Sequence, residues 1–141
     1  MPDIDTSNAV DIGTMFALTN IVEIPPLDTS KVETFNSLLN GCKKITKIHQ
    51  LDFSSAKSIN DWCNYNNTLL KYIKIINLGK SELTTYKSFA ANWGTGSEEN
   101  RQSVIDTLIV YSYDRAANNM PTATVTLSTN TKALLTEEEL V

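Results

Sequence analysis

The side chains that could carry out chemistry in this chain are few and widely separated. His49 is the single histidine, and Cys42 and Cys63 are the only two cysteines. A zinc site needs several Cys, His or carboxylate ligands at close spacing, and His49 has none at such spacing. A nucleophilic cysteine needs a histidine base and an orienting partner. We therefore expect no metal, no cofactor and no catalytic residue, and we expect both cysteines to be buried thiols.

A ladder of polar residues offers the other candidate chemistry. Asp5, Asp28 and Asp52 recur at nearly equal intervals, and Asn77 stands near the next position. Oxygen ligands of this kind are the ones that calcium accepts. Aspartate also closes turns, because its side chain accepts hydrogen bonds from the local backbone. We favour turn capping and keep a calcium site as the alternative.

The ladder belongs to a unit that recurs four times. The units begin at Ile4 ("IDTSNAVDIGTMF"), Leu27 ("LDTSKVETFNSLL"), Leu51 ("LDFSSAKSINDWC") and Leu78. Four positions in every unit are apolar, and their spacing is typical of one buried face of a short helix. In the second unit these positions are Val32, Phe35, Leu38 and Leu39. Each unit is therefore predicted to carry a short helix.

An extended segment precedes each later unit, namely "IVEI", "ITKI" and "LKYI". One strand and one helix in a period of twenty-odd residues is the signature of a leucine-rich-repeat solenoid, whose units stack to close a shared core. The sequence thus predicts an α/β solenoid of four leucine-rich repeats over residues 1–93. Short parallel strands would form one face and short helices the other. The fourth unit is longer, and we place its extra residues within "IINLGKSEL".

The repeat resembles the BspA-like leucine-rich-repeat surface proteins of bacteria and phages. Residues 27–32 correspond to the family's LDTSNV, Leu38 and Leu39 to the end of its helix, and residues 41–48 to its NCxxLTxI. The resemblance covers residues 4–93. It implies an extracellular protein, on a bacterial cell surface or a phage virion, that serves adhesion. It implies no catalytic residues.

Residues 94–141 are predicted to form a C-terminal, repeat-like unit of loop, helix, strand and helix. "NWGTGSEENRQS" predicts the loop, and Ser97 with its two following glutamates predicts a helix start. The alternation in "IDTLIVYSY" also permits a strand, but we favour the helix. "TATVTLS" predicts a strand, and "LTEEELV" predicts a closing helix with Thr136 and Glu139 at capping-box spacing. The tail resembles closing units that normally continue into a further strand, so we expect truncation or a longer parent protein.

Charge and hydropathy exclude two classes of partner. A net charge of −4 opposes binding to nucleic acid or to an anionic membrane. The apolar runs are far shorter than the ~20 residues of a transmembrane helix. No signal peptide is recognisable in this chain. We expect no nucleic acid partner and no membrane insertion, and export would require an internal fragment or another route.

The strand face is the predicted binding surface. If Ile24, Ile48 and Ile73 point inward, their neighbours point outward, because side chains alternate along a strand. Two outward rows result, Glu23, Lys47 and Tyr72 in one and Pro25, His49 and Lys74 in the other. Solenoids commonly bind ligands on such faces, and a merely solvated face is the alternative. Tyr72 is the expected anchor.

These observations predict a non-enzymatic interaction or adhesion module that binds a protein or a cell-surface glycan, as part of a larger assembly. The alternative is a structural spacer, or a capsid or tail decoration protein, without a ligand of its own. An enzyme is not expected, because the sequence shows no nucleophile–base pair and no metal cluster.

Overall fold

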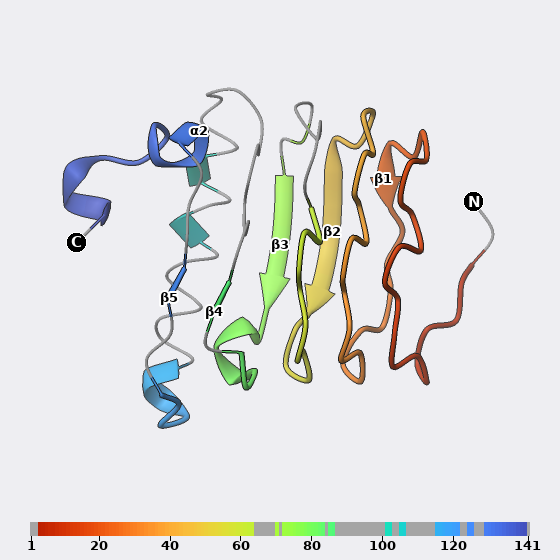
Figure 1. Cartoon of the computed structure of the whole chain (residues 1–141), viewed down its shortest axis with the longest axis horizontal. Coiled ribbons are helices and arrows are strands. Elements are labelled where there is room, and N and C mark those ends of the chain that lie inside the picture. The colour runs from red at the N-terminus through yellow and green to blue at the C-terminus, as the bar shows by residue number, and fades with distance from the viewer. Residues whose placement is uncertain are drawn as a thin grey trace.

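The structure, a computed structural model, describes residues 3–63, 70, 72–83, 85–86, 101–102, 105–106, 115–121, 124–125 and 129–140. Its elements are β1 (Glu23–Ile24), β2 (Lys47–Asp52), β3 (Tyr72–Ile76), the 3-10 helix η1 (Leu78–Lys80), β4 (Thr85–Tyr86), β5 (Thr124–Val125), α2 (Thr129–Lys132) and the 3-10 helix η2 (Glu137–Leu140). Figure 1 shows successive coils of the chain side by side, from β1 at one end to β5 at the other. We call residues 4–26 coil 1, residues 27–50 coil 2, and the segment from residue 51 to β3 coil 3.

One side of the stack is a three-stranded parallel sheet in the order β1-β2-β3. Glu23 pairs with Lys47, and Ile24 pairs with Ile48, which in turn pairs with Ile73. Parallel strands need a long connection between them, and one full coil supplies it here. The three strands begin within the predicted extended segments, and Ile24 and Ile48 are completely buried.

The opposite side consists of turns. Where short helices are predicted within residues 3–63, the backbone N–H groups alternate between two kinds of acceptor. Met15 N–H donates to the Ile12 carbonyl in its own coil at 3.2 Å, whereas Phe16 N–H donates to the Leu38 carbonyl of coil 2 at 3.2 Å. An α-helix would need each of these N–H groups for its own i−4 carbonyl. The predicted helices are therefore wrong in this part of the chain.

Left-handed backbone conformations allow this alternation. Thr14, Ser37 and Asp61 occupy one repeat position and have φ values of 58°, 54° and 51°. Leu18 (60°) and Gly41 (73°) occupy a second. A right-handed helix cannot contain such residues, each of which costs roughly 1–2 kcal/mol when it is not glycine. The turns still return side chains to the core every three or four residues, which explains the helix-like apolar spacing.

The core consists of side chains stacked from coil to coil. The Phe35 and Phe53 ring centroids are 4.3 Å apart, and Phe53 meets Trp62 edge-on at 5.5 Å. Leu38 and Trp62 share a repeat position and are both fully buried. Met15 holds that position in coil 1 but is exposed. The difference follows from location, since coil 1 forms the outer edge of the described stack.

The fourth unit begins earlier than predicted. The register of β2 with β3 puts Leu51 opposite Ile75, and not in line with Leu78. The 3-10 helix η1 then adds one turn within "IINLGKSEL", where the extra residues are predicted. Leu78, the first residue of η1, remains buried in the same core.

The C-terminal unit adds a second, two-stranded sheet in which β4 and β5 are parallel. Strand β5 lies within the predicted "TATVTLS" strand, residues 101–102 and 105–106 are helical as preferred, and η2 is a 3-10 helix in the predicted closing helix. The Ser97 helix start lies outside the described residues. No described helix has the length and apolarity needed to cross a membrane.

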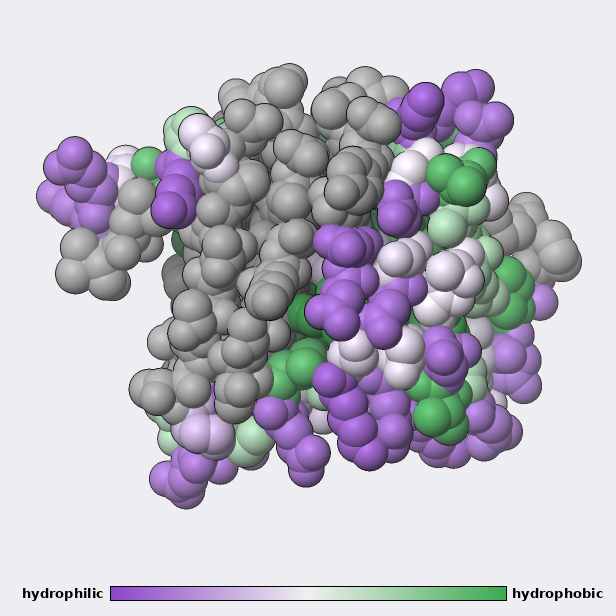
Figure 2. All heavy atoms as spheres, in the orientation of Figure 1, coloured by the Kyte–Doolittle hydropathy of each residue, from purple (hydrophilic) through white to green (hydrophobic). Residues whose placement is uncertain are grey.

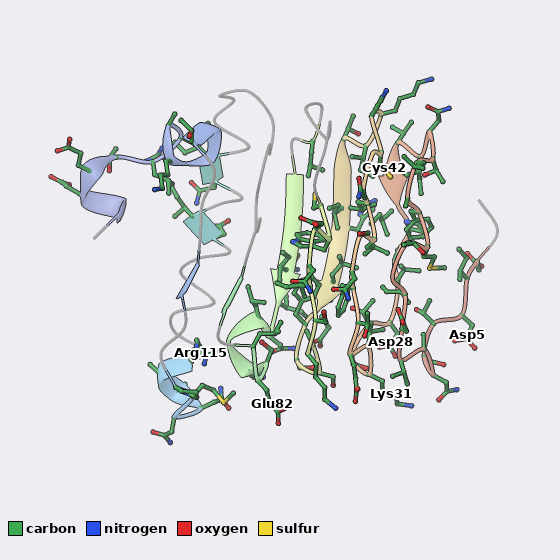
Figure 3. The ribbon with its side chains drawn as sticks, in the orientation of Figure 1. Asp5, Asp28, Lys31, Cys42, Glu82 and Arg115 are labelled. Atoms are coloured by element: carbon green, nitrogen blue, oxygen red, sulfur yellow. The ribbon has the colours of Figure 1, made fainter. Side chains whose placement is uncertain are left out.

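The buried Arg115 joins this unit to the fourth repeat (Figure 3). Its Nη1 donates to the carbonyls of Ser81 (3.3 Å) and Leu83 (3.1 Å), and its Nε donates to the Pro121 carbonyl at 2.8 Å. A guanidinium offers five donors in a fixed fork, so one side chain can hold carbonyls from two segments.

Replacing Leu38 by alanine tests the core assignment. Leu38→Ala should lower the free energy of unfolding by roughly 2–5 kcal/mol, because it leaves a cavity between stacked coils. The exposed Lys43→Ala in the same coil should change it by less than about 0.5 kcal/mol. Denaturant unfolding of both variants measures the difference, and equal effects would contradict the core assignment.

Candidate functional site

The candidate site is the outer face of the β1-β2-β3 sheet. Ile24 and Ile48 point into the core, whereas Glu23 is exposed and Lys47 is half-buried. The register places Glu23 opposite Lys47, and Lys47 opposite Tyr72, so the backbone brings the first predicted row together. The side chain of Tyr72 lies outside the described part of the structure.

A bulge in β2 interrupts this face. Ile48 pairs with Ile73 and Leu51 with Ile75, which leaves two residues of β2 opposite the single Lys74 of β3. Those two residues are His49 and Gln50. A bulge releases residues from the ladder and re-aims their side chains. The second predicted row, Pro25, His49 and Lys74, therefore gains Gln50 as an additional residue.

Sequence reasoning missed Gln50, which is exposed beside His49. A signal was present in the spacing of the strand-paired residues. They are three apart in β2, at Ile48 and Leu51, but two apart in β3, at Ile73 and Ile75. Pro25 of the predicted row is half-buried and follows the end of β1, while Lys74 is exposed on β3.

The ionic contact on this face is diagonal. Glu23 Oε2 lies 3.3 Å from His49 Nε2, an ion pair whenever the imidazole is protonated. Both partners of the diagonal contact are solvent-accessible, so it contributes at most about 1 kcal/mol. A ligand could therefore displace it at low cost.

The aspartate ladder closes turns. Asp5 Oδ1 accepts hydrogen bonds from the Ser7 hydroxyl (2.7 Å) and the Ser7 N–H (3.0 Å). Asp28 Oδ1 accepts the same pair from Ser30, at 2.7 and 3.1 Å. The serine hydroxyl, and then its N–H, holds the pKa of each aspartate below its usual value, because both donors stabilise the carboxylate.

Asp52 continues the ladder in coil 3. Its Oδ1 accepts from the Ser54 N–H, and its Oδ2 accepts from Asn77 Nδ2, both at 2.8 Å. The turn-capping prediction is confirmed by these contacts. Among the described residues, no group of three or more His, Cys, Asp or Glu side chains is placed to hold a metal ion.

Polar side chains outside the sheet face are engaged between coils. The described pairs span 2.7–3.0 Å: Lys31 Nζ with Asn8 Oδ1, Lys57 Nζ with Glu33 Oε1, and Ser58 Oγ with Asn36 Oδ1. The hydrogen bond that Lys57 donates to the Glu33 carboxylate also raises the pKa of Lys57, because it stabilises the ammonium form. These groups hold adjacent coils in register, so they are less suited than the sheet face to a ligand.

Both cysteines are buried thiols outside any disulfide, as predicted. Cys42 Sγ donates to the Phe16 carbonyl at 2.9 Å, so it joins coil 2 to coil 1.

A buried threonine joins coil 2 to coil 3. Thr29 Oγ1 donates to the Asp52 carbonyl at 2.9 Å and accepts from the Asp52 N–H at 2.7 Å. Thr6 holds the same repeat position in coil 1 and is also buried. Its Oγ1 has no hydrogen-bond partner among the described residues.

Comparisons with protein-family models, curated proteins and solved structures find no match to this chain. The resemblance of residues 4–93 to the BspA-like proteins therefore stays a prediction.

The two threonines form a matched pair for mutation. Thr29→Val should lower the free energy of unfolding by about 1–3 kcal/mol, because it removes the hydroxyl that serves both backbone groups of Asp52. Thr6→Val should be neutral or stabilising, because it removes a buried hydroxyl without a partner. Thermal and denaturant unfolding compare them. A larger loss for Thr6→Val would contradict this assignment.

The caps predict a specific pH dependence. Because folding lowers the pKa of Asp28 from its usual 3.8, its stabilising contribution is present above that value and is lost as pH falls through the folded pKa. Asp28→Asn should therefore be less stable than the parent at pH 7, with a gap that narrows toward pH 3. The stability gap between Ser30→Ala and the parent should narrow in the same way, since this change removes the hydroxyl that donates to Asp28. Unfolding curves across this range measure both, and a gap independent of pH would rule the cap out as the source.

Proposed function

We propose that the stacked coils form a leucine-rich-repeat solenoid, and that the protein is a non-enzymatic interaction module. It binds a protein or a cell-surface glycan through the outer face of β1, β2 and β3. Its place is a bacterial cell surface or a phage virion, within a larger assembly.

The β2 bulge is the observation that carries this proposal. It sets His49 and Gln50 against Lys74, beside the row of Glu23, Lys47 and Tyr72. Bulges are over-represented where a side chain must be re-aimed, as beside functional sites. The face thus gathers carboxylate, amide, imidazole and ammonium groups on a rigid parallel sheet.

The chemistry of these groups suits a polar ligand. Lys47 and Lys74 can bind carboxylates of an acidic protein patch or an acidic glycan, and Gln50 can both donate and accept a hydrogen bond. Tyr72 would supply a large, rigid contact surface with one hydroxyl at modest entropic cost. The Glu23–His49 contact can open to accommodate the ligand, because it is exposed and weak.

A double substitution on the sheet face tests the proposal. Tyr72→Ala with Lys47→Ala should weaken binding to bacterial cells, or to a ligand found on a glycan array, by at least about tenfold, since one desolvated anchor contributes 2 kcal/mol or more. Circular dichroism should show an unchanged fold. Gln50→Ala should weaken binding to a lesser degree.

The matched control lies away from the sheet. Glu33→Gln with Lys57→Gln removes one ion pair between coils 2 and 3 and should leave binding intact. Loss of binding only in this control would move the site to the turn side. If the parent protein binds neither cells nor arrays, the structural spacer is the better account.

A further inference from the structure

The basic residues of this acidic chain are concentrated in the segments that form the sheet. The chain as a whole has a net charge of −4. Residues 41–50, which lead into β2, contain three lysines and His49 but no Asp or Glu. Residues 62–81, which include β3, contain three more lysines and again no Asp or Glu. The sheet-forming segments are therefore positively charged within a molecule that is negative overall.

The described lysines of these segments reach solvent beside the sheet. Lys74 is exposed on β3, and Lys47 is half-buried on β2. Lys43 and Lys44 are exposed in the turn that precedes β2. An anionic ligand on this face gains from these charges, because complementary potentials favour association.

Glu23 is the acidic side chain that faces this group. Its Oε2 lies 3.3 Å from His49 Nε2, and its backbone is paired with that of Lys47. The other carboxylate in β1, β2 and β3 is Asp52, which accepts hydrogen bonds from the Ser54 N–H and the Asn77 amide. Glu23 thus holds a carboxylate beside the β2 bulge, where a carboxylate of a ligand would meet the same basic groups.

The polar character of the face favours a glycan over a protein. The centre of a protein–protein interface is typically depleted of Lys and Glu and enriched in aromatic residues and Met. Figure 2 shows hydrophobic surface at the N-terminal end of the molecule, among hydrophilic residues. The large hydrophobic side chains that are exposed in the described residues all precede β1: Val10, Met15, Leu18 and Val22. The described side chains of the strands offer ammonium, imidazole and amide groups instead, which suit the hydroxyls and carboxylates of an acidic sugar.

We infer that the ligand of the sheet face is a carboxylated glycan, a chain of uronic acid residues, and that one of its carboxylates displaces Glu23. The inference rests on the proposed function of this face. The sugar carboxylate accepts charge-assisted hydrogen bonds from the lysines, which are stronger than bonds between neutral groups. Glu23 competes for the same position, so it lowers the affinity for the glycan.

Oligogalacturonate and its methyl ester are the matched probes, because the ester has the same sugar chain without the charge. Fluorescence anisotropy with labelled probes should show saturable binding of the acid form to the full chain. The ester should bind at least about tenfold more weakly, since hydrogen bonds to charged groups are lost. Lys74→Gln should weaken binding of the acid form by at least about threefold for the same reason.

Glu23→Gln should have the opposite effect. It should tighten binding of oligogalacturonate by about three- to fivefold, the range expected from loss of a weak, exposed competing contact. Glu82→Gln is the control, because it removes the same charge from an exposed residue beyond the end of β3 (Figure 3). It should leave the affinity unchanged in about 0.15 M salt, where charges further apart than about 8 Å are largely screened. All variants should keep the circular dichroism spectrum of the parent.

Several results would overturn the inference. Absence of binding, or equal binding of acid and ester, would reject a carboxylated glycan. Equal binding of an oligoglutamate of the same charge would make an acidic peptide the ligand. Equal tightening by Glu23→Gln and Glu82→Gln, or none by either, would reject displacement of Glu23.

Failure of the inference can be told apart from failure of the proposed function. If oligogalacturonate does not bind, but Tyr72→Ala with Lys47→Ala abolishes binding to cells, only the inference fails. If oligogalacturonate binds and the double variant binds it equally well, the sheet face is not the site and both fail.

Discussion

The fold depends on how each coil satisfies its backbone. A coil of about 23 residues cannot bury its polar groups alone, because an unpaired buried N–H costs roughly 1–3 kcal/mol. The chain resolves this by alternation: one N–H turns back to its own coil, and the next reaches the neighbouring coil, as Met15 and Phe16 do. The parallel sheet does the same on the other side. Each coil is therefore stable only when it is packed against, and hydrogen-bonded to, a neighbouring coil.

The sequence predicted the parts that follow from apolar spacing. The repeat positions of Phe35, Leu38 and Leu39 are buried, and the strands begin where the extended segments are. It did not distinguish turns from helices, because both return a side chain to the core every three or four residues. The decisive left-handed residues carried no signal in coil 1, where Thr14 and Leu18 replace the expected glycine or asparagine.

The candidate site was predictable to the level of register. Alternation along the strands placed Glu23 and Lys47 in one outward row, and the sheet pairs them. The bulge and the diagonal contact to His49 depend on how two strands of unequal length are paired. That pairing cannot be predicted from the sequence of either strand alone. The aspartate caps were predictable because they are local: each carboxylate meets the serine two residues along.

Arg115 gives the junction after the fourth repeat its own resistance to force and heat. In a quasi-one-dimensional array each coil is held by its neighbours, so loss of structure starts at an end. At the C-terminal end one guanidinium spans 34 residues of sequence and ties the last repeat to the segment that follows it. Unfolding that starts in the segment after the fourth repeat must therefore break the hydrogen bonds of Arg115 before it reaches the stacked aromatic core.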